Sequence, residues 1–410
     1  MTEFGVDAEA AELGFDPERL TRIDTRLKAW VDAGQLPGWL VAVGRAGRTV
    51  HLSTYGHRDV EAGAPVGVDT LWRLYSMTKP VTSVAAMMLY EEGRLALTDP
   101  VSDYIPAFAE VQVFDGGNAT RPRTVPAAEP VTVWHLLTHT AGLTYGFHRA
   151  HPVDEMYRAA GFEWAHPKGF DLADSCEAWA RIPLLFQPGA EWNYSVATDV
   201  LGRVVEVVSG MRLDDFLRTR ILQPLGMHET DFHVPEDRAE RLATLYGAGP
   251  DGRAQLLPGM GRVANRPPHH LSGGGGLVGT AADYDRFTRM LLGRGQLDGV
   301  RLLGSRTVDY MARNHLPGGA DLGSFGRPLF AEASPEAHGF GLGFSVVQDP
   351  AALRGLGSAG EFAWGGAAST LFWVDPVEEI TVLFLTQLLP AGTLPLRSVL
   401  RGLVQQALVD

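Results

Sequence analysis

The chain has 410 residues, of which 45% are hydrophobic and 20% are charged, a composition typical of a folded globular protein. Its formal net charge of -13 at pH 7 would repel phosphate groups, so we expect neither nucleic acid nor an anionic membrane as a partner, and small neutral or apolar molecules fit better. Cys176 is the sole cysteine, which excludes an internal disulfide and a metal cluster built from cysteines.

The amino-terminal sequence carries no signal for export or membrane insertion. MTEFGVDAEAAELGF is acidic and has neither the basic nor the apolar region of a secretory signal. No apolar run elsewhere approaches the roughly 18 residues that a membrane span needs. We therefore expect a cytoplasmic protein.

The first part of the chain predicts a helix, a β-hairpin and a second helix. Apolar residues at helical spacing after an Asp-Pro start predict a helix over Asp16–Asp32. The apolar stretches Trp39–Val43 and Thr49–Tyr55 flank a turn at residues 45–47 and predict two antiparallel strands. The second helix, apolar at helical spacing, is expected to begin at Ser76.

The middle of the chain predicts mainly helices and loops, and the last part predicts strands. The expected helices are Val133–Leu137, Ser175–Arg181, Val196–Val208, Leu213–Ile221, Ala281–Leu292 and Pro395–Leu408. The expected strands are Leu342–Val347, Ala363–Trp373 and Glu379–Leu385. Because strands lie near both ends, we predict a discontinuous α/β sheet domain of residues 1–65 and 270–410, and a mostly helical region of residues 66–269.

The sequence Ser76-Met77-Thr78-Lys79 places a hydroxyl three residues before an amine at the start of the second helix. Positions i and i+3 lie on one helix face with Cβ atoms about 5–6 Å apart, so Lys79 can reach the Ser76 oxygen. The chain has only three lysines, and a desolvated lysine, unlike arginine, can lose its proton and act as a base. The tetrapeptide therefore predicts a nucleophile beside a base.

Three further segments complete a pattern that resembles a known family. Residues 188–195 read PGAEWNYS and contain Tyr194, residues 135–143 read HLLTHTAGL, and residues 364–366 read WGG. Together with S-x-x-K, these segments resemble the motifs of the serine β-lactamase and penicillin-binding-protein superfamily. Within it the chain is most similar to the family VIII carboxylesterases, which share the class C β-lactamase fold. The resemblance implies an antiparallel sheet built from both chain ends, flanked by helices, with a mostly helical inserted region.

The resemblance also implies cleavage of carboxylic esters through an acyl-enzyme on Ser76, with Lys79 and Tyr194 as a coupled general base and acid. Lysine and tyrosine have ordinary pKa values of about 10.4 and 10, so one of them must be lowered for work near neutral pH. Burial lowers the pKa of an amine, and a nearby ammonium lowers that of a phenol. Either residue can be the first proton acceptor.

The same resemblance assigns an oxyanion hole and a substrate-binding surface. The backbone N–H groups of Ser76 and Ala367 form the hole. Trp364 is expected as an apolar wall for the acyl or alcohol group, and Gly365 and Gly366 allow close approach of the ligand. Tyr145 is a further substrate-binding candidate.

Two departures from the β-lactamase pattern favour esters with short acyl chains. Val196 occupies the asparagine position of the class C motif Y-x-N, and Trp364 replaces a cationic or imidazole residue. Both changes remove groups that would pair with a β-lactam. Three other functions stay open: an acyltransferase with the same acyl-enzyme, a β-lactamase or D-amino-acid peptidase, and a non-catalytic sensor.

We expect no cofactor and no metal. His135 and His139 lie at i and i+4, but no third ligand or H-E-x-x-H pattern accompanies them. The pair His269-His270 predicts a solvated loop. Two further segments, Phe147–Asp171 and Ala320–Ala337, are expected to be loops that cover the cleft and set specificity.

Overall fold

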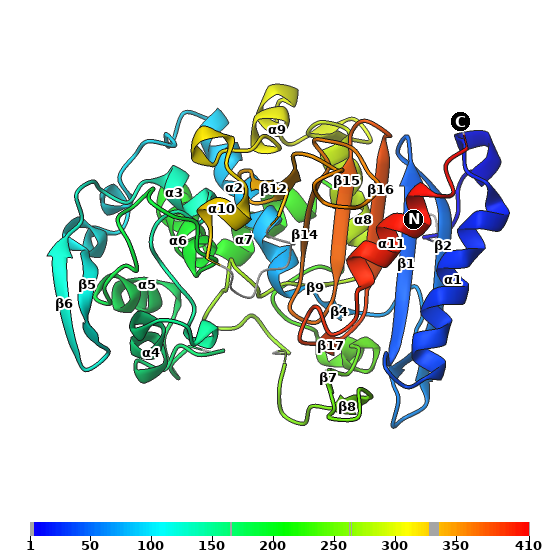
Figure 1. Cartoon of the computed structure of the whole chain (residues 1–410), viewed down its shortest axis with the longest axis horizontal. Coiled ribbons are helices and arrows are strands. Elements are labelled where there is room, and N and C mark those ends of the chain that lie inside the picture. Colours follow the sequence, from blue (N-terminus) through cyan, green and yellow to red (C-terminus); the bar gives the residue numbers. More distant parts are fainter. Residues whose placement is uncertain (1–3, 165, 262, 264, 328–335, 410) are drawn as a thin grey trace.

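The computed structural model describes residues 4–164, 166–261, 263, 265–327 and 336–409. An antiparallel sheet with helices on both faces occupies one half of the molecule, and a mostly helical region occupies the other half (Figure 1). This is the β-lactamase-like fold that the sequence predicts.

The main sheet has the strand order β12-β13-β14-β15-β16-β1-β2-β3. The strands are β1 (Gly38–Arg45), β2 (Arg48–Asp59), β3 (Ala64–Pro65), β12 (His338–Phe340), β13 (Ser345–Val347), β14 (Phe362–Gly365), β15 (Leu371–Asp375) and β16 (Ile380–Leu385). At its centre β1 pairs with β16, with Leu40 opposite Leu385 and Arg45 opposite Ile380. The two ends of the chain therefore build one sheet, as predicted.

Both faces of this sheet are buried. Successive side chains of a strand point to opposite faces, so Trp39, Val41 and Val43 pack toward one layer and Leu40 and Ala42 toward the other. The first layer contains α1 (Pro17–Asp32) and α11 (Leu396–Gln405), and the second contains α8 (Ala281–Leu292) and α2 (Thr78–Glu91). Burial on both sides explains the nearly continuous apolar sequence of β1.

The helical half is arranged around α2. Every residue of α2 from Thr78 to Leu89 is buried, so this helix is enclosed on all sides rather than on one face. The other helices are α3 (Val133–Leu137), α4 (Pro152–Ala159), α5 (Leu172–Ala180), α6 (Ala197–Ser209), α7 (Leu213–Leu217) with a π-helical turn at Arg218–Leu222, α9 (Ser305–Met311) and α10 (Leu322–Phe325). The predicted helices Val133–Leu137 and Ala281–Leu292 are confirmed with those bounds.

Short two- and three-stranded sheets complete the structure. They comprise β4 (Trp72–Arg73) with β9 (Val278–Gly279), β5 (Gln112–Asn118) with β6 (Arg121–Pro126), β10 (Gln296–Leu297) with β11 (Val300–Arg301), and β17 (Leu388–Leu389) with β7 (Tyr246–Ala248) and β8 (Ala254–Leu256). The pair β4–β9 matters for the site, because it fixes the backbone just before Ser76.

Several predicted elements were wrong in detail. Residues Ala363–Trp373 form two strands, β14 and β15, because the chain turns back at residues 366–370. Only Ser345–Val347 of the predicted strand Leu342–Val347 forms a strand. The predicted loops Phe147–Asp171 and Ala320–Ala337 contain α4 and α10, respectively. The division into two domains stays a prediction.

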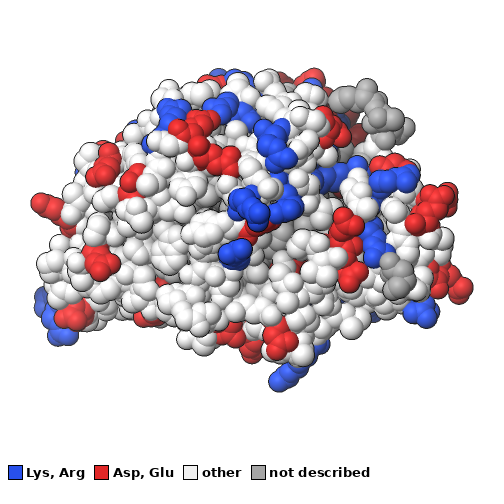
Figure 2. All heavy atoms as spheres, turned by 90° about the horizontal axis from the view of Figure 1, so that it is seen from above, with Lys and Arg blue, Asp and Glu red and all other residues white. Residues whose placement is uncertain are grey.

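The described part of the chain has no helix that is both long and apolar enough to cross a membrane. On the face seen from above in Figure 2, basic side chains gather near the middle and acidic ones lie around them.

Candidate active site

Ser76 lies in a single 3-10 turn, Tyr75–Met77, that leads into α2. The serine therefore lies two residues before Thr78, the first residue of α2, instead of beginning the helix. Tyr75 has a φ of 47°, a left-handed conformation that is costly for a residue with a side chain. Tyr284 holds the turn in place, because its hydroxyl donates to the Met77 carbonyl at 2.9 Å.

Lys79 is buried, with 1% of its surface exposed, and its ammonium points at Ser76. Its Nζ donates to Ser76 Oγ at 3.3 Å, to the Tyr145 hydroxyl at 3.1 Å and to the Gly274 carbonyl at 2.7 Å. Asp199 on α6 fixes this carbonyl, since its carboxylate accepts the Gly274 N–H at 3.0 Å. The predicted proximity of Ser76 and Lys79 is present in the structure.

Tyr194 also reaches Ser76, although 118 residues separate them. The Tyr194 hydroxyl donates to Ser76 Oγ at 2.6 Å. Lys79 Nζ lies 4.5 Å from the centre of the Tyr194 ring, within the range of a cation–π contact. The structure thus brings the three residues of the predicted catalytic set together at one oxygen atom.

His139 packs against the Tyr194 ring. The two rings lie 5.1 Å apart, and His139 Nδ1 is 3.1 Å from Ser195 Oγ. Burial, together with the nearby charge of Lys79, holds the pKa of His139 well below its usual range, so the ring is neutral. Its predicted pair partner, His135, accepts the Thr132 N–H at Nδ1 as part of a helix cap.

The backbone before Ala367 packs directly against the backbone before Ser76. A Cβ atom on Gly366 would lie 2.5 Å from the Leu74 carbonyl oxygen and 3.3 Å from Tyr75 Cβ. Only glycine allows this approach. Ala367 and Ser76 consequently line the same cavity, which is the arrangement that an oxyanion hole built from their N–H groups requires.

Trp364 occupies a different place from the one expected. Its side chain is fully buried, and it is not among the described residues that line the cavity. Its ring lies 5.5 Å from that of Tyr194 and 5.4 Å from that of Phe340, so it packs behind the tyrosine. Because β14 is a buried strand, Trp364 supports Tyr194 instead of forming a wall for the substrate. Gly365 and Gly366 also lie outside the lining.

The cavity in front of Ser76 has a volume of about 440 Å³. Of the predicted residues, Ser76, Tyr145, Tyr194, Val196 and Ala367 line it. The lining also contains aromatic residues that no sequence motif marks as binding residues, namely Phe147, Phe162, Trp164, Trp179 and Phe232. Tryptophan and phenylalanine content alone could not identify them, because aromatic residues most often fill cores.

Three of the lining rings form a continuous stack that leads outward from Lys79. Tyr145 stacks on Phe147 with centroids 4.6 Å apart, and Phe147 stacks on Trp164 at 4.3 Å. Trp164 is 56% exposed. Part of the predicted covering segment Phe147–Asp171 thus borders the cavity. None of the described residues of Ala320–Ala337 does so, and residues 328–335 of that segment lie outside the described part.

Arg73 and a histidine pair add polar groups to the cavity. The Arg73 guanidinium is half-buried and donates to the carbonyls of Gly261 and Ala243. His270 is buried and stacks on His166 with centroids 4.0 Å apart, so the prediction of a solvated loop was wrong for this residue. Burial and the neighbouring His270 lower the pKa of His166 to about 4.

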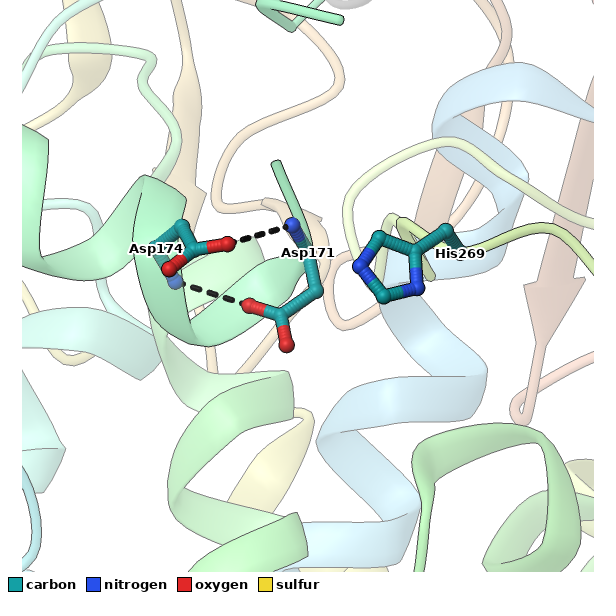
Figure 3. A group of neighbouring side chains, drawn as sticks. All are labelled: Asp171, Asp174 and His269. Atoms are coloured by element: carbon teal, nitrogen blue, oxygen red, sulfur yellow. Dashed lines mark hydrogen bonds between the residues drawn. The ribbon is translucent and has the colours of Figure 1, made fainter. Parts of the chain in front are cut away.

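Asp171, Asp174 and His269 form a cluster near the cavity that has the composition of a metal site (Figure 3). Their potential ligand atoms lie within 4.8 Å of one another. However, Asp171 accepts the Asp174 N–H at 2.8 Å and Asp174 accepts the Asp171 N–H at 3.0 Å, a reciprocal cap of α5. Helix capping therefore explains the two carboxylates.

Comparisons with known proteins agree with this architecture. The family model described as Beta-lactamase matches residues 23–405. Protein Rv1367c of Mycobacterium tuberculosis is 40% identical over 363 residues, covering 88% of each chain. Esterase EstB of Burkholderia gladioli is 33% identical over 404 residues, covering 94% of each chain. The solved structure of EstCE1, "a hydrolase with promiscuous acyltransferase activity", matches with a TM-score of 0.79 and 27% identity, over 96% of this chain and 99% of that one.

Proposed function

This chain belongs to the Beta-lactamase family, and we propose that it is a carboxylic ester hydrolase that works through an acyl-enzyme on Ser76. One observation carries the proposal. The Ser76 oxygen lies 2.6 Å from the Tyr194 hydroxyl and 3.3 Å from the Lys79 amine, at the edge of a cavity that Ala367 also lines. These groups are a nucleophile and two candidate bases within hydrogen-bond reach of each other, beside a cavity that a candidate backbone donor also lines.

In the proposed first step, Ser76 Oγ attacks the ester carbonyl carbon and gives its proton to the Lys79–Tyr194 pair. We treat the pair as one unit, because both groups hydrogen-bond to the same oxygen. The carbonyl oxygen becomes an oxyanion that accepts from the N–H groups of Ser76 and Ala367. The C–O bond to the alcohol then breaks, and the alcohol leaves with the proton that the pair holds.

In the second step, water attacks the acyl carbon of the Ser76 ester. The pair takes the proton from the water and returns it to Ser76 Oγ as the acid is released. Lys79 is held for this shuttle by the Gly274 carbonyl and the Tyr145 hydroxyl, whose oxygens lie 2.7 and 3.1 Å from Nζ. Tyr145 thus positions Lys79 and also lines the cavity.

The cavity supports an ester whose acyl group is short and whose alcohol part is apolar. Val196 lines the cavity where a β-lactamase of class C has an amide, so no side chain at this position can pair with a β-lactam amide. The stack of Tyr145, Phe147 and Trp164 offers flat apolar surface to a ring or chain of the alcohol.

A second candidate is an acyltransferase that passes the same acyl group to an alcohol. The exposed end of the aromatic stack favours it, because an apolar alcohol bound there could reach the acyl-enzyme in place of water. Analysis of the products formed in the presence of added alcohols separates the two reactions: the acid indicates hydrolysis and a new ester indicates transfer.

Rapid-mixing kinetics with p-nitrophenyl butyrate test the proposal. We expect a burst of p-nitrophenol equal to the enzyme concentration, followed by slower turnover. Ser76→Ala should abolish the burst. Ser272→Ala is the matched control, because Ser272 lines the same cavity but donates to Asp199. A burst that survives in Ser76→Ala and disappears in Ser272→Ala would refute the assignment.

A further inference from the structure

A second cavity is separated from the first by the connection between β14 and β15. It has a volume of about 670 Å³ and is bordered by residues 353–356, the start of β15 and the beginning of α11. Ala367 lines the cavity that contains Ser76, whereas Ser369 and Thr370 line the second one. The proposed ester chemistry makes no use of this space.

Positive charge converges on the second cavity. Arg354, Arg397 and Arg401 line it, and none of the described lining residues is an aspartate or a glutamate. The buried Glu361 carboxylate, which pairs with Arg401, offsets only one of these three charges. An anion is therefore the kind of molecule that this lining attracts.

Arg401 gives the strongest indication of a missing ligand group. Its side chain is 5% exposed, and one of its terminal nitrogens pairs with the buried carboxylate of Glu361. Its Nε has no hydrogen-bond partner among the described residues. A buried guanidinium N–H without an acceptor is costly, and an anion in the cavity can supply the acceptor.

The rest of the lining is largely aliphatic. It includes Leu353, Leu356, Leu371, Leu394 and Leu396, and Leu356 is 55% exposed. The first residues of α11 add the positive end of a helix dipole. Three arginines with five leucines match a molecule that has one negative group and an aliphatic body, whereas inorganic phosphate would leave the leucines uncovered.

We propose that this cavity binds an aliphatic carboxylate, with its carboxylate on the arginines and its chain against the leucines. The planar guanidinium fork matches a carboxylate in shape and charge. The site is separate from Ser76, so the proposal does not depend on the reaction that takes place there.

Titration calorimetry of the full chain with octanoate tests this site. We expect one octanoate per chain, and at least about tenfold weaker binding by Arg354→Gln/Arg397→Gln, a change that corresponds to the loss of charged contacts. Arg181→Gln is the matched control, because that arginine side chain is 77% exposed on the surface near the end of α5, and it should change the affinity less than about twofold. Octanol should also bind at least about tenfold more weakly than octanoate.

Three results would overturn the proposal. The first is that the double variant binds octanoate as tightly as the wild type does. The second is that the wild type binds inorganic phosphate as tightly as octanoate. The third is that octanoate inhibits ester turnover competitively, and equally in the double variant and the wild type. The last result would place octanoate in the Ser76 cavity. A cooperative thermal unfolding transition would show that the double variant is folded. The single variant Arg354→Gln changes an exposed residue and gives the same test with less perturbation of the structure. Since calorimetry records binding alone, a failed esterase assay would not affect the outcome.

Discussion

Replacing Gly366 by alanine tests whether the β14–β15 connection supplies an oxyanion donor. The new Cβ would lie 2.5 Å from the Leu74 carbonyl oxygen and 2.3 Å from Thr370 Oγ1. The threonine side chain can rotate away, but the carbonyl belongs to the backbone just before Ser76. The connection must therefore move, and the Ala367 N–H moves with it.

Loss of one oxyanion donor costs about 2.7–4 kcal/mol in the transition state, so kcat of Gly366→Ala should fall about 100- to 1000-fold. KM should change little, because the donor acts mainly on the charge that develops during the reaction. Steady-state kinetics with p-nitrophenyl butyrate measure both. Gly402→Ala on α11 is the control, since a Cβ there meets no atom within 4 Å. A Gly366→Ala enzyme with wild-type kcat would refute the role of Ala367.

Three further predictions concern the base pair, the aromatic stack and stability. Lys79→Arg and Tyr194→Phe should each lower kcat at least about 100-fold. The kcat of the double variant should be little lower than that of either single variant, as for groups that act as a unit. If steady-state kinetics show that the two losses multiply, the residues act independently. Trp164→Ala should raise KM for a p-nitrobenzyl ester about tenfold while KM for methyl butyrate stays the same, because the stack covers only larger alcohols; equal effects on both esters would contradict this placement. Burial raises the pKa of Asp283 to about 6, so the folded state binds its proton more tightly than the unfolded state, and this contribution to stability is lost as the pH rises from about 4 through 6. In urea unfolding, the free energy of unfolding of Asp283→Asn minus that of the wild type should therefore rise by about 2–3 kcal/mol from pH 4 to pH 8. If this difference does not change with pH, the Asp283 carboxyl is not buried as described.

The parts of the site that depend on local geometry were predictable from the sequence. Ser76 and Lys79 are three residues apart, so helical spacing alone places the amine near the hydroxyl, and the structure has them 3.3 Å apart. Tyr194 could be found only through the family resemblance, because no local rule relates residues 118 positions apart. Its loop is brought to Ser76 by the packing of α6 against α2.

The errors have physical causes in burial. Residues Ala363–Trp373 read as one strand because β14 and β15 are buried on both faces, which removes the alternation that would mark their ends. The expectation for Trp364 rested on the family resemblance, and a motif position does not reveal which face of a buried strand a side chain occupies. His270 looks solvated in sequence, but its stacking on His166 depends on a distant loop.

The most direct test of the central claim is mass spectrometry of enzyme quenched during turnover of p-nitrophenyl butyrate. We expect intact protein that is heavier by one butyryl group, and a peptide digest that places this group on Ser76. Ser76→Ala should show no added mass, and Ser272→Ala should still acquire it. A butyryl group on any other residue, or turnover without an acylated species under conditions that give a burst, would contradict the acyl-enzyme on Ser76.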